Sequence, residues 1–301
     1  MSCPNATSPI DISMSNIKGK CDLKCSYGFQ YGNSSCIATN RANYISMSYD
    51  KVSSNPVLYN STGYYVQEVR LYTPSLHSYN GSKTDGELII LHASNTGSKP
   101  LLVCIPIKSN NTSSQIALFF KTLIDTVSSS APADGESTTI NATQYNLDNF
   151  VPKKPFFSYS ATEPYQPCSS SVDFIVFSPL QTSLDIMPET LTVLQSVISK
   201  NKYEVTTGPN LFYNERGPSS QGANNGDIYI DCQPVGSTDD TTEIITSVSG
   251  SPYPTSMRDL LKNVYIQLLL GSLLFIILLY FVKYLLSIVK PVKIINSIRR
   301  I

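Results

Sequence analysis

The chain has 301 residues, with 22 Lys and Arg, 22 Asp and Glu and a formal net charge of zero. Seven of the basic and four of the acidic residues lie in residues 235–301, which leaves 15 basic and 18 acidic side chains in residues 1–234. This slightly acidic body lacks the basic surface of a nucleic-acid-binding domain, so we expect no nucleic-acid partner. Its length suits one large domain with a core of its own plus short appendages.

Residues 1–234 have the pattern of a β-rich domain. Apolar and polar side chains alternate in short runs such as 44–49 and 173–177, and clusters of Gly, Pro, Asn and Ser separate the runs. Such punctuation favours strands over helices. The sequence therefore predicts a mostly β domain over residues 1–234.

Residues 264–282 contain no charged side chain. As a helix, these 19 residues would extend about 28 Å at 1.5 Å per residue, close to the thickness of a bilayer's hydrocarbon core. A buried core helix is the alternative, but such a helix usually has a polar stripe. We predict one C-terminal transmembrane helix within residues 261–289. The expected anchor includes Val264, Leu269, Phe275 and Tyr280.

The segments on either side of this helix predict its orientation. Residues 283–301 hold five Lys and Arg and no acidic residue, and residues 290–301 form a basic tail. Residues 1–12 have neither the basic nor the apolar region of a signal peptide. We expect a tail-anchored, single-pass protein with residues 235–260 as a stalk and the large N-terminal domain on the side opposite the basic tail.

The seven cysteines are unevenly spaced. Cys21 and Cys25 resemble half of a zinc site, but no second Cys or His pair follows at the interval of a ligand pair. Disulfides or buried thiols are therefore the favoured alternatives. Cys104 lies inside an apolar run and is expected to be a free core thiol.

Five segments together resemble the α-carbonic anhydrase family. They are SPIDI at 8–12, SLHSYNG at 75–81, ELIILH at 87–92, the Tyr, Pro and Cys-containing stretch at 156–177, and FYNERGPSSQ at 212–221. They occur in the family's order over residues 3–234. The resemblance implies a large, twisted, mainly antiparallel sheet with short peripheral helices.

Members of that family bind zinc through three histidines, two of them two residues apart on one strand and the third on a neighbouring strand. The resemblance places Arg70 and Tyr72 at the first two positions and Ile89 at the third. A guanidinium is a permanent cation and an isoleucine has no lone pair, so we expect no zinc, no other cofactor and no hydratase activity. A buried arginine needs a carboxylate partner, and Glu68 and Glu87 are the candidates by strand proximity.

The two histidines of the chain do not replace the missing ligands. His92 is three residues from Ile89, and this odd offset directs the two side chains to opposite faces of a strand. The resemblance matches His77 and His92 to two structural histidines of the family. We therefore expect both to form hydrogen bonds in the core.

The resemblance also implies a disulfide. Exported family members link a cysteine near the amino terminus to one in the turn that follows the tyrosine strand, and Cys3 and Cys168 stand at those positions. Closing a loop of about 165 residues would stabilise the fold by an amount on the order of 4 kcal/mol in the chain-entropy model.

A catalytically inactive domain on a C-terminal anchor resembles the carbonic-anhydrase-like envelope proteins by which poxviruses bind glycosaminoglycans on cells. We therefore predict a virion membrane protein of a large DNA virus that binds a host cell-surface glycan or protein. Arg70, Lys83, Lys153 and Lys154 are candidates for a ligand patch, although the net acidic body argues against a sulfated chain. One alternative is a minor virion protein that tethers the capsid to an internal membrane and contacts capsid or other virion proteins. A cellular adhesion module is the other alternative.

Overall fold

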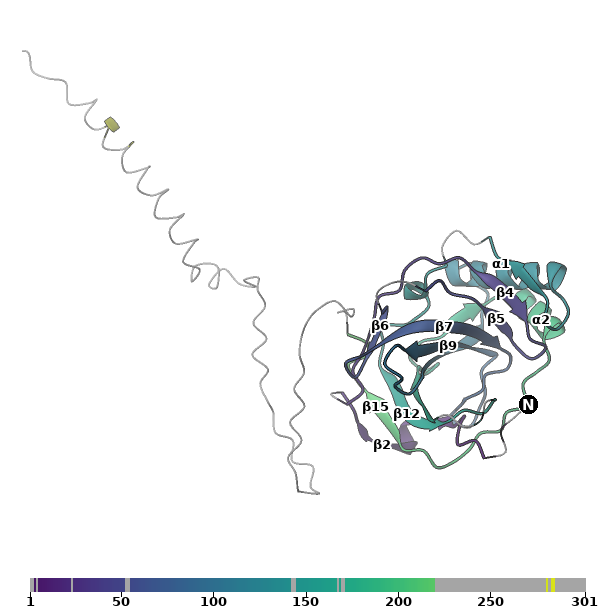
Figure 1. Cartoon of the computed structure of the whole chain (residues 1–301), viewed down its shortest axis with the longest axis horizontal. Coiled ribbons are helices and arrows are strands. Elements are labelled where there is room, and N and C mark those ends of the chain that lie inside the picture. Colours follow the sequence, from purple (N-terminus) through teal and green to yellow (C-terminus); the bar gives the residue numbers. More distant parts are fainter. Residues whose placement is uncertain are drawn as a thin grey trace, which may run out of the picture. The chain divides into compact units, whose positions relative to one another are not determined.

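A computed structural model of the chain describes residues 3, 5–22, 24–51, 55–141, 145–166, 168, 171–219, 280 and 283–284. The chain divides into two units, Met1–Asp231 and Cys232–Ile301. All the strands and helices described below belong to the first unit, and Figure 1 shows their arrangement.

Among the described residues, thirteen strands form one large sheet and two more form a small separate pair. The strands of the large sheet are β2 (Ile17–Lys20), β3 (Tyr27–Phe29), β4 (Ile37–Asn40), β5 (Ile45–Met47), β6 (Val57–Tyr59), β7 (Thr62–Tyr72), β9 (Gly86–Ser94), β10 (Leu101–Ser109), β11 (Ser137–Thr139), β12 (Phe156–Thr162), β13 (Ser171–Val176), β14 (Leu184–Ile186) and β15 (Leu211–Asn214). The separate pair is β1 (Asp11–Ile12) and β8 (Ser78–Tyr79).

The order along the large sheet is β11-β4-β5-β7-β9-β10-β13-β12-β15-β2, with β14 beside β10 and with β6 joining β3 to β7. The predicted mostly β fold is confirmed. The sheet is mixed, however: β10 runs parallel to β13 and β14, and β15 runs parallel to β2, whereas the central pairs β7–β9 and β9–β10 are antiparallel. Parallel neighbours require a long connection, and here α1, β11 and β12 intervene between β10 and β13.

Two α-helices, α1 (Gln115–Ser130) and α2 (Pro188–Val197), pack against each other on one flank of the sheet (Figure 1). Short 3-10 helices occur at η1 (Met14–Asn16) and η2 (Leu147–Asn149). The Ser114 side chain caps the start of α1 by accepting a hydrogen bond from the backbone N–H of Ala117 at 3.2 Å. The helix buries an apolar face made of Ala117, Phe119, Phe120, Leu123, Ile124 and Val127.

The core lies on both faces of the central strands. Along β10, Val103 and Ile105 belong to the cluster that includes α1, whereas Leu102 and Cys104 belong to a second cluster on the other face. This alternation follows from the two-residue period of a strand. The second cluster also contains Tyr72 and Ile89, and the candidate site is therefore on that face.

In the described part of the chain, no helix is long and apolar enough to cross a membrane. Most of the segment predicted to do so, 261–289, lies outside that part, as do the stalk at 235–260 and the tail at 290–301. Of the expected anchor residues, Tyr280 alone is described, and it is helical and exposed.

Candidate functional site

The three positions that the resemblance assigns to zinc ligands meet on one face of the sheet. Arg70 on β7 is the direct cross-strand partner of Ile89 on β9, and Tyr72 follows Arg70 by two residues. Alternate residues of a strand share a face, so the three side chains lie on the same side. Tyr72 and Ile89 are fully buried in the same cluster.

Arg70 forms an ion pair with Glu68. The Nε and Nη2 atoms of Arg70 lie 2.8 and 2.7 Å from Oε2 of Glu68, and Oε1 of Glu68 accepts a hydrogen bond from the Ser46 hydroxyl. The Arg70 and Glu68 side chains are 14% and 21% exposed. Of the two candidate carboxylates, Glu68 is therefore the partner of Arg70.

Two tyrosine rings contact the guanidinium group, and two more tyrosines pack against them. The guanidinium carbon of Arg70 lies 5.0 Å from the ring centroid of Tyr44 and 4.6 Å from that of Tyr165, both within cation–π range. Tyr72 packs against Tyr44 and Tyr203, with centroids 5.1 and 6.5 Å apart, and Tyr203 also packs against Tyr165. We call Tyr44, Tyr72, Tyr165 and Tyr203 the tyrosine enclosure. Sequence analysis missed it, and the 19 tyrosines of the chain were the only available signal.

The surroundings shift the pKa values of Arg70 and Tyr72 upward. Burial by itself lowers the pKa of Arg70, but Tyr72, Tyr165 and the Glu68 carboxylate raise it, and the net shift is upward. Burial raises the pKa of Tyr72 far above its ordinary value, and the charge of Arg70 offsets only part of that rise. Burial also raises the pKa values of Tyr44, Tyr165 and Tyr203, so the guanidinium is charged and the surrounding phenols are neutral.

His77 lies in a buried hydrogen-bond network rather than in this cluster. Its Nδ1 atom is 2.6 Å from Oε1 of Glu87, and its Nε2 atom is 2.7 Å from the Tyr159 hydroxyl. The backbone N–H groups of Leu76 and His77 donate to Oε2 of Glu87 at 2.6 and 3.1 Å. Burial would raise the pKa of Glu87, but His77 and these two N–H groups lower it, and the net shift is downward.

His92 lies on the opposite face of β9 from Ile89, as its odd offset predicts. Its Nε2 atom is 2.8 Å from the Tyr31 hydroxyl, and its Nδ1 atom is 3.2 Å from the Leu101 carbonyl oxygen. Because a carbonyl only accepts, Nδ1 carries the proton in the neutral ring. Burial lowers the pKa of His92 to about 4. The prediction that both histidines form hydrogen bonds in the core is confirmed.

Comparison with known proteins finds similar solved structures but no matching family model or curated sequence. No protein-family model matches the chain, and no curated protein sequence matches it. The solved structures that match include the α-carbonic anhydrase of Thermovibrio ammonificans in complex with sulfanilamide, at 17% identity and a TM-score of 0.57 over 69% of this chain and 86% of that one. Carbonic anhydrase Cah3 of Chlamydomonas reinhardtii matches at 16% identity and a TM-score of 0.59, over 70% of this chain and 91% of that one. Dioscorin complexed with ascorbate matches at 15% identity and a TM-score of 0.57, over 72% of this chain and 88% of that one.

The chain has an α-carbonic anhydrase-like fold. At these identities the likeness concerns the fold alone, so the chemistry of the site depends on the residues that this chain places there.

The residues of the Arg70 cluster do not fit a zinc ion. Arg70 adds a positive charge at the first position, Tyr72 stays protonated at the second, and Ile89 offers no lone pair at the third. Zinc requires neutral imidazole, thiolate or carboxylate donors, and the Glu68 carboxylate, which contacts this cluster, is already paired with Arg70. On this α-carbonic anhydrase-like sheet the three positions form a salt-bridged, aromatic cluster.

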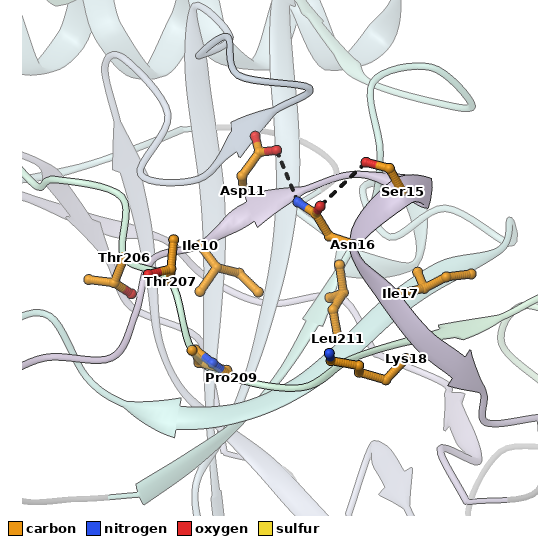
Figure 2. A pocket seen from close by; sticks show the side chains of 11 residues that line it. Ile10, Asp11, Ser15, Asn16, Ile17, Lys18, Thr206, Thr207, Pro209 and Leu211 are labelled. Atoms are coloured by element: carbon orange, nitrogen blue, oxygen red, sulfur yellow. Dashed lines mark hydrogen bonds between the residues drawn. The ribbon is translucent and has the colours of Figure 1, made fainter.

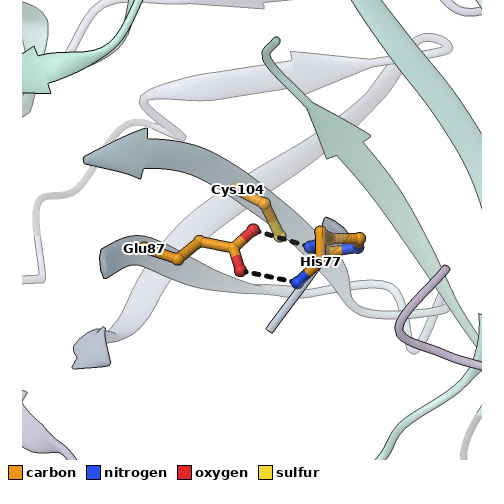
Figure 3. A group of neighbouring side chains, drawn as sticks. All are labelled: His77, Glu87 and Cys104. Atoms are coloured by element: carbon orange, nitrogen blue, oxygen red, sulfur yellow. Dashed lines mark hydrogen bonds and ion pairs between the residues drawn. The ribbon is translucent and has the colours of Figure 1, made fainter. Parts of the chain in front are cut away.

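Away from the Arg70 cluster, one group in the described residues has side chains that could hold a metal ion. It consists of His77, Glu87 and Cys104, whose ligand atoms lie within 4.8 Å of one another (Figure 3). Both ring nitrogens of His77 already have hydrogen-bond partners. Burial, and to a lesser extent Glu87, raises the pKa of the Cys104 thiol well above its ordinary value, so the thiolate needed for metal binding is disfavoured. His77 and Glu87 are best explained as a hydrogen-bonded pair in the core, and Cys104 is a buried thiol beside them.

Two disulfides join cysteines within the described residues. Cys3 is joined to Cys168, which is the pairing that the resemblance implied, with the Cα atoms 5.4 Å apart. Cys21 is joined to Cys25, so of the alternatives for this pair the structure has the disulfide. Cys104 is a free, buried thiol, as predicted.

The four candidates for a ligand patch have different surroundings. The charge of Arg70 is paired with Glu68, and the Lys83 ammonium donates to the backbone oxygen of Tyr203 at 2.9 Å, next to the tyrosine enclosure. Lys153 and Lys154 are exposed and lie in the turn before β12. Only Lys83 therefore borders the Arg70 cluster.

Proposed function

We propose that this chain is a non-enzymatic, membrane-anchored virion surface protein of a large DNA virus, and that its α-carbonic anhydrase-like domain binds a ligand on the host cell. The observation that carries the non-enzymatic part is the Arg70–Glu68 pair inside the tyrosine enclosure. A domain with this cluster in place of metal donors has no means of generating a zinc-bound hydroxide.

Two measurements on the purified full chain test this part. We expect no zinc to remain after dialysis against a metal-free buffer, and carbon dioxide hydration at the background rate in the presence of added zinc. Stoichiometric zinc that accelerates hydration would refute the proposal.

The membrane part rests on the sequence. Residues 264–282 are uncharged and mostly apolar, and residues 283–301 are basic. This pattern supports a single span with the domain on the opposite side from the tail. Protease and antibody access to the domain on intact particles tests its exposure. Access supports attachment, whereas a shielded domain would favour a structural protein that tethers the capsid to an internal membrane.

The charge of the body bears on the ligand. Residues 1–234 carry more acidic than basic side chains, and Arg70 is already paired. Sulfated chains need a basic groove, so a protein or an unsulfated glycan is the better supported host ligand. Adsorption of the full chain in liposomes to cultured cells tests attachment directly, and adsorption no greater than that of empty liposomes would refute it.

A further inference from the structure

A pocket of about 440 Å³ lies between the segment that leads into β2 and the segment that leads into β15 (Figure 2). At one end, Ile10 and Thr206 form a parallel bridge, and the Thr206 N–H donates to the Pro9 carbonyl oxygen at 2.7 Å. At the other end, Leu211 pairs with Ile17 in the sheet. Because the two segments are joined at both ends, the pocket between them is formed before any ligand binds.

A carboxylate and an amide lie together on one wall. Asn16 Nδ2 donates to Asp11 Oδ2 over 3.4 Å, and Ser15 Oγ donates to Asn16 Oδ1 over 3.3 Å (Figure 2). The other oxygen of Asp11 accepts from the Ser78 hydroxyl at 2.6 Å and from the Gly81 N–H at 2.8 Å, which fixes the carboxylate. The contacts of Asn16 are long and exposed, so ligand hydroxyl groups can replace them at little cost.

The remaining lining combines hydroxyl groups with aliphatic surface. Thr207 contributes a hydroxyl, and the Thr206 hydroxyl, which donates to the Pro9 carbonyl oxygen at 3.1 Å, can still accept a hydrogen bond. Branched apolar side chains come from Ile10, Ile17 and Leu211. A sugar ring presents the same combination, with hydroxyl groups around its edge and C–H groups on its faces. Adjacent ring hydroxyls can donate to a carboxylate and both donate to and accept from an amide.

The charge of the lining decides between kinds of glycan. One carboxylate, from Asp11, and one ammonium, from Lys18, line the pocket. With no excess of positive charge, the pocket does not favour a sulfated polyanion. We propose that it binds one neutral sugar residue of a cell-surface glycan; this inference rests on the proposed attachment function and names its ligand class.

Saturation-transfer NMR on the full chain in nanodiscs tests the pocket. The probes are neutral monosaccharides, among them galactose, mannose, glucose and N-acetylgalactosamine, with a sulfated disaccharide for comparison. We expect saturation transfer to at least one neutral sugar, weakened roughly five- to tenfold by Asn16→Ala through loss of its hydrogen bonds and abolished by Thr207→Tyr, which fills the pocket. Asn210→Ala is the matched control, because Asn210 is exposed in the same segment but does not line the pocket.

Three results would overturn the pocket assignment: no transfer to any neutral sugar at millimolar concentrations, transfer to the sulfated disaccharide alone, or equal transfer in all variants with unchanged thermal unfolding. Adsorption of the same variants in liposomes to cultured cells separates this inference from the attachment function. Adsorption that survives Thr207→Tyr would remove the pocket's role and leave attachment intact. Sugar binding without any adsorption to cells would remove attachment and leave the pocket.

Discussion

Replacement of Arg70 by Met removes the guanidinium and leaves the Glu68 carboxylate without its partner. Both side chains are mostly buried, at 14% and 21% exposed. Breaking a buried ion pair by removing one member costs about 3 to 5 kcal/mol, and the partial exposure here favours the lower end of that range. Loss of the contacts with Tyr44 and Tyr165 adds about 0.5 kcal/mol each. We therefore expect Arg70→Met to lower the free energy of unfolding by about 4 kcal/mol.

The cost should come mainly from the orphaned carboxylate. The double variant Arg70→Met with Glu68→Gln removes both charges, so we expect it to recover most of the loss and to unfold within about 1 to 2 kcal/mol of the wild type. Lys121→Met is the matched control, because Lys121 pairs with Asp125 on the exposed face of α1 and its loss should have no measurable effect.

Urea unfolding of the full chain in mild detergent, followed by far-UV circular dichroism, measures these differences. Circular dichroism is used because the chain contains no Trp for a fluorescence signal. An Arg70→Met variant within 1 kcal/mol of the wild type would refute the reasoning. A double variant no more stable than the single one would also refute it, since the carboxylate would then not be the source of the cost.

Three further predictions follow from buried groups. Since burial lowers the pKa of His92 from 6.5 to about 4, the unfolded chain takes up a proton between these pH values that the folded chain does not, and stability present above pH 6.5 is lost as the pH falls. The loss should reach about 3 kcal/mol at pH 4. In urea titrations from pH 7 to 4, the free energy of unfolding should decline less steeply for His92→Gln than for the wild type. Parallel declines in the two proteins would contradict this assignment. Cys3→Ser should lower the free energy of unfolding by about 4 to 5 kcal/mol through loss of the Cys3–Cys168 link, which non-reducing peptide mapping of the wild type should detect; two free thiols there would count against the pairing. Tyr31→Phe should cost about 1 kcal/mol, because the Tyr31 hydroxyl bonds to His92 and to the Tyr27 hydroxyl. Tyr145→Phe should cost nothing, because the buried Tyr145 hydroxyl has no hydrogen-bond partner among the described residues. Equal urea midpoints for the two variants would refute that comparison.

The faces on which the site residues lie could be predicted from strand periodicity, whereas their assignment to the site came from the family resemblance. The two-residue spacing of Arg70 and Tyr72 placed them on one face, and the three-residue offset between Ile89 and His92 placed that pair on opposite faces. The expectation that Cys104 is a buried thiol also came from its position in an apolar strand. Each of these inferences needs only the local geometry of a strand, which a short stretch of sequence specifies.

Strand spacing did not identify which carboxylate pairs with Arg70. Glu87 is the cross-strand neighbour of Tyr72, so both Glu68 and Glu87 remained candidates. The structure directs the Glu87 carboxylate to His77 and to the backbone N–H of Leu76, which leaves Glu68 for Arg70. The loop that places His77 beside Glu87 therefore leaves Glu68 as the partner of Arg70. The spacing of residues along a strand does not predict the conformation of that loop.

The sequence by itself determined the β-rich body, the face on which each strand residue lies, and the apolar, basic-flanked segment at the carboxyl end. Only the tertiary structure revealed the tyrosine enclosure, the parallel pairs in the sheet and the pocket between the segments that lead into β2 and β15. Strand faces follow from covalent geometry over two residues. The enclosure and the pocket instead depend on where segments more than 100 residues apart in the chain come together, and that is set by how the whole core packs.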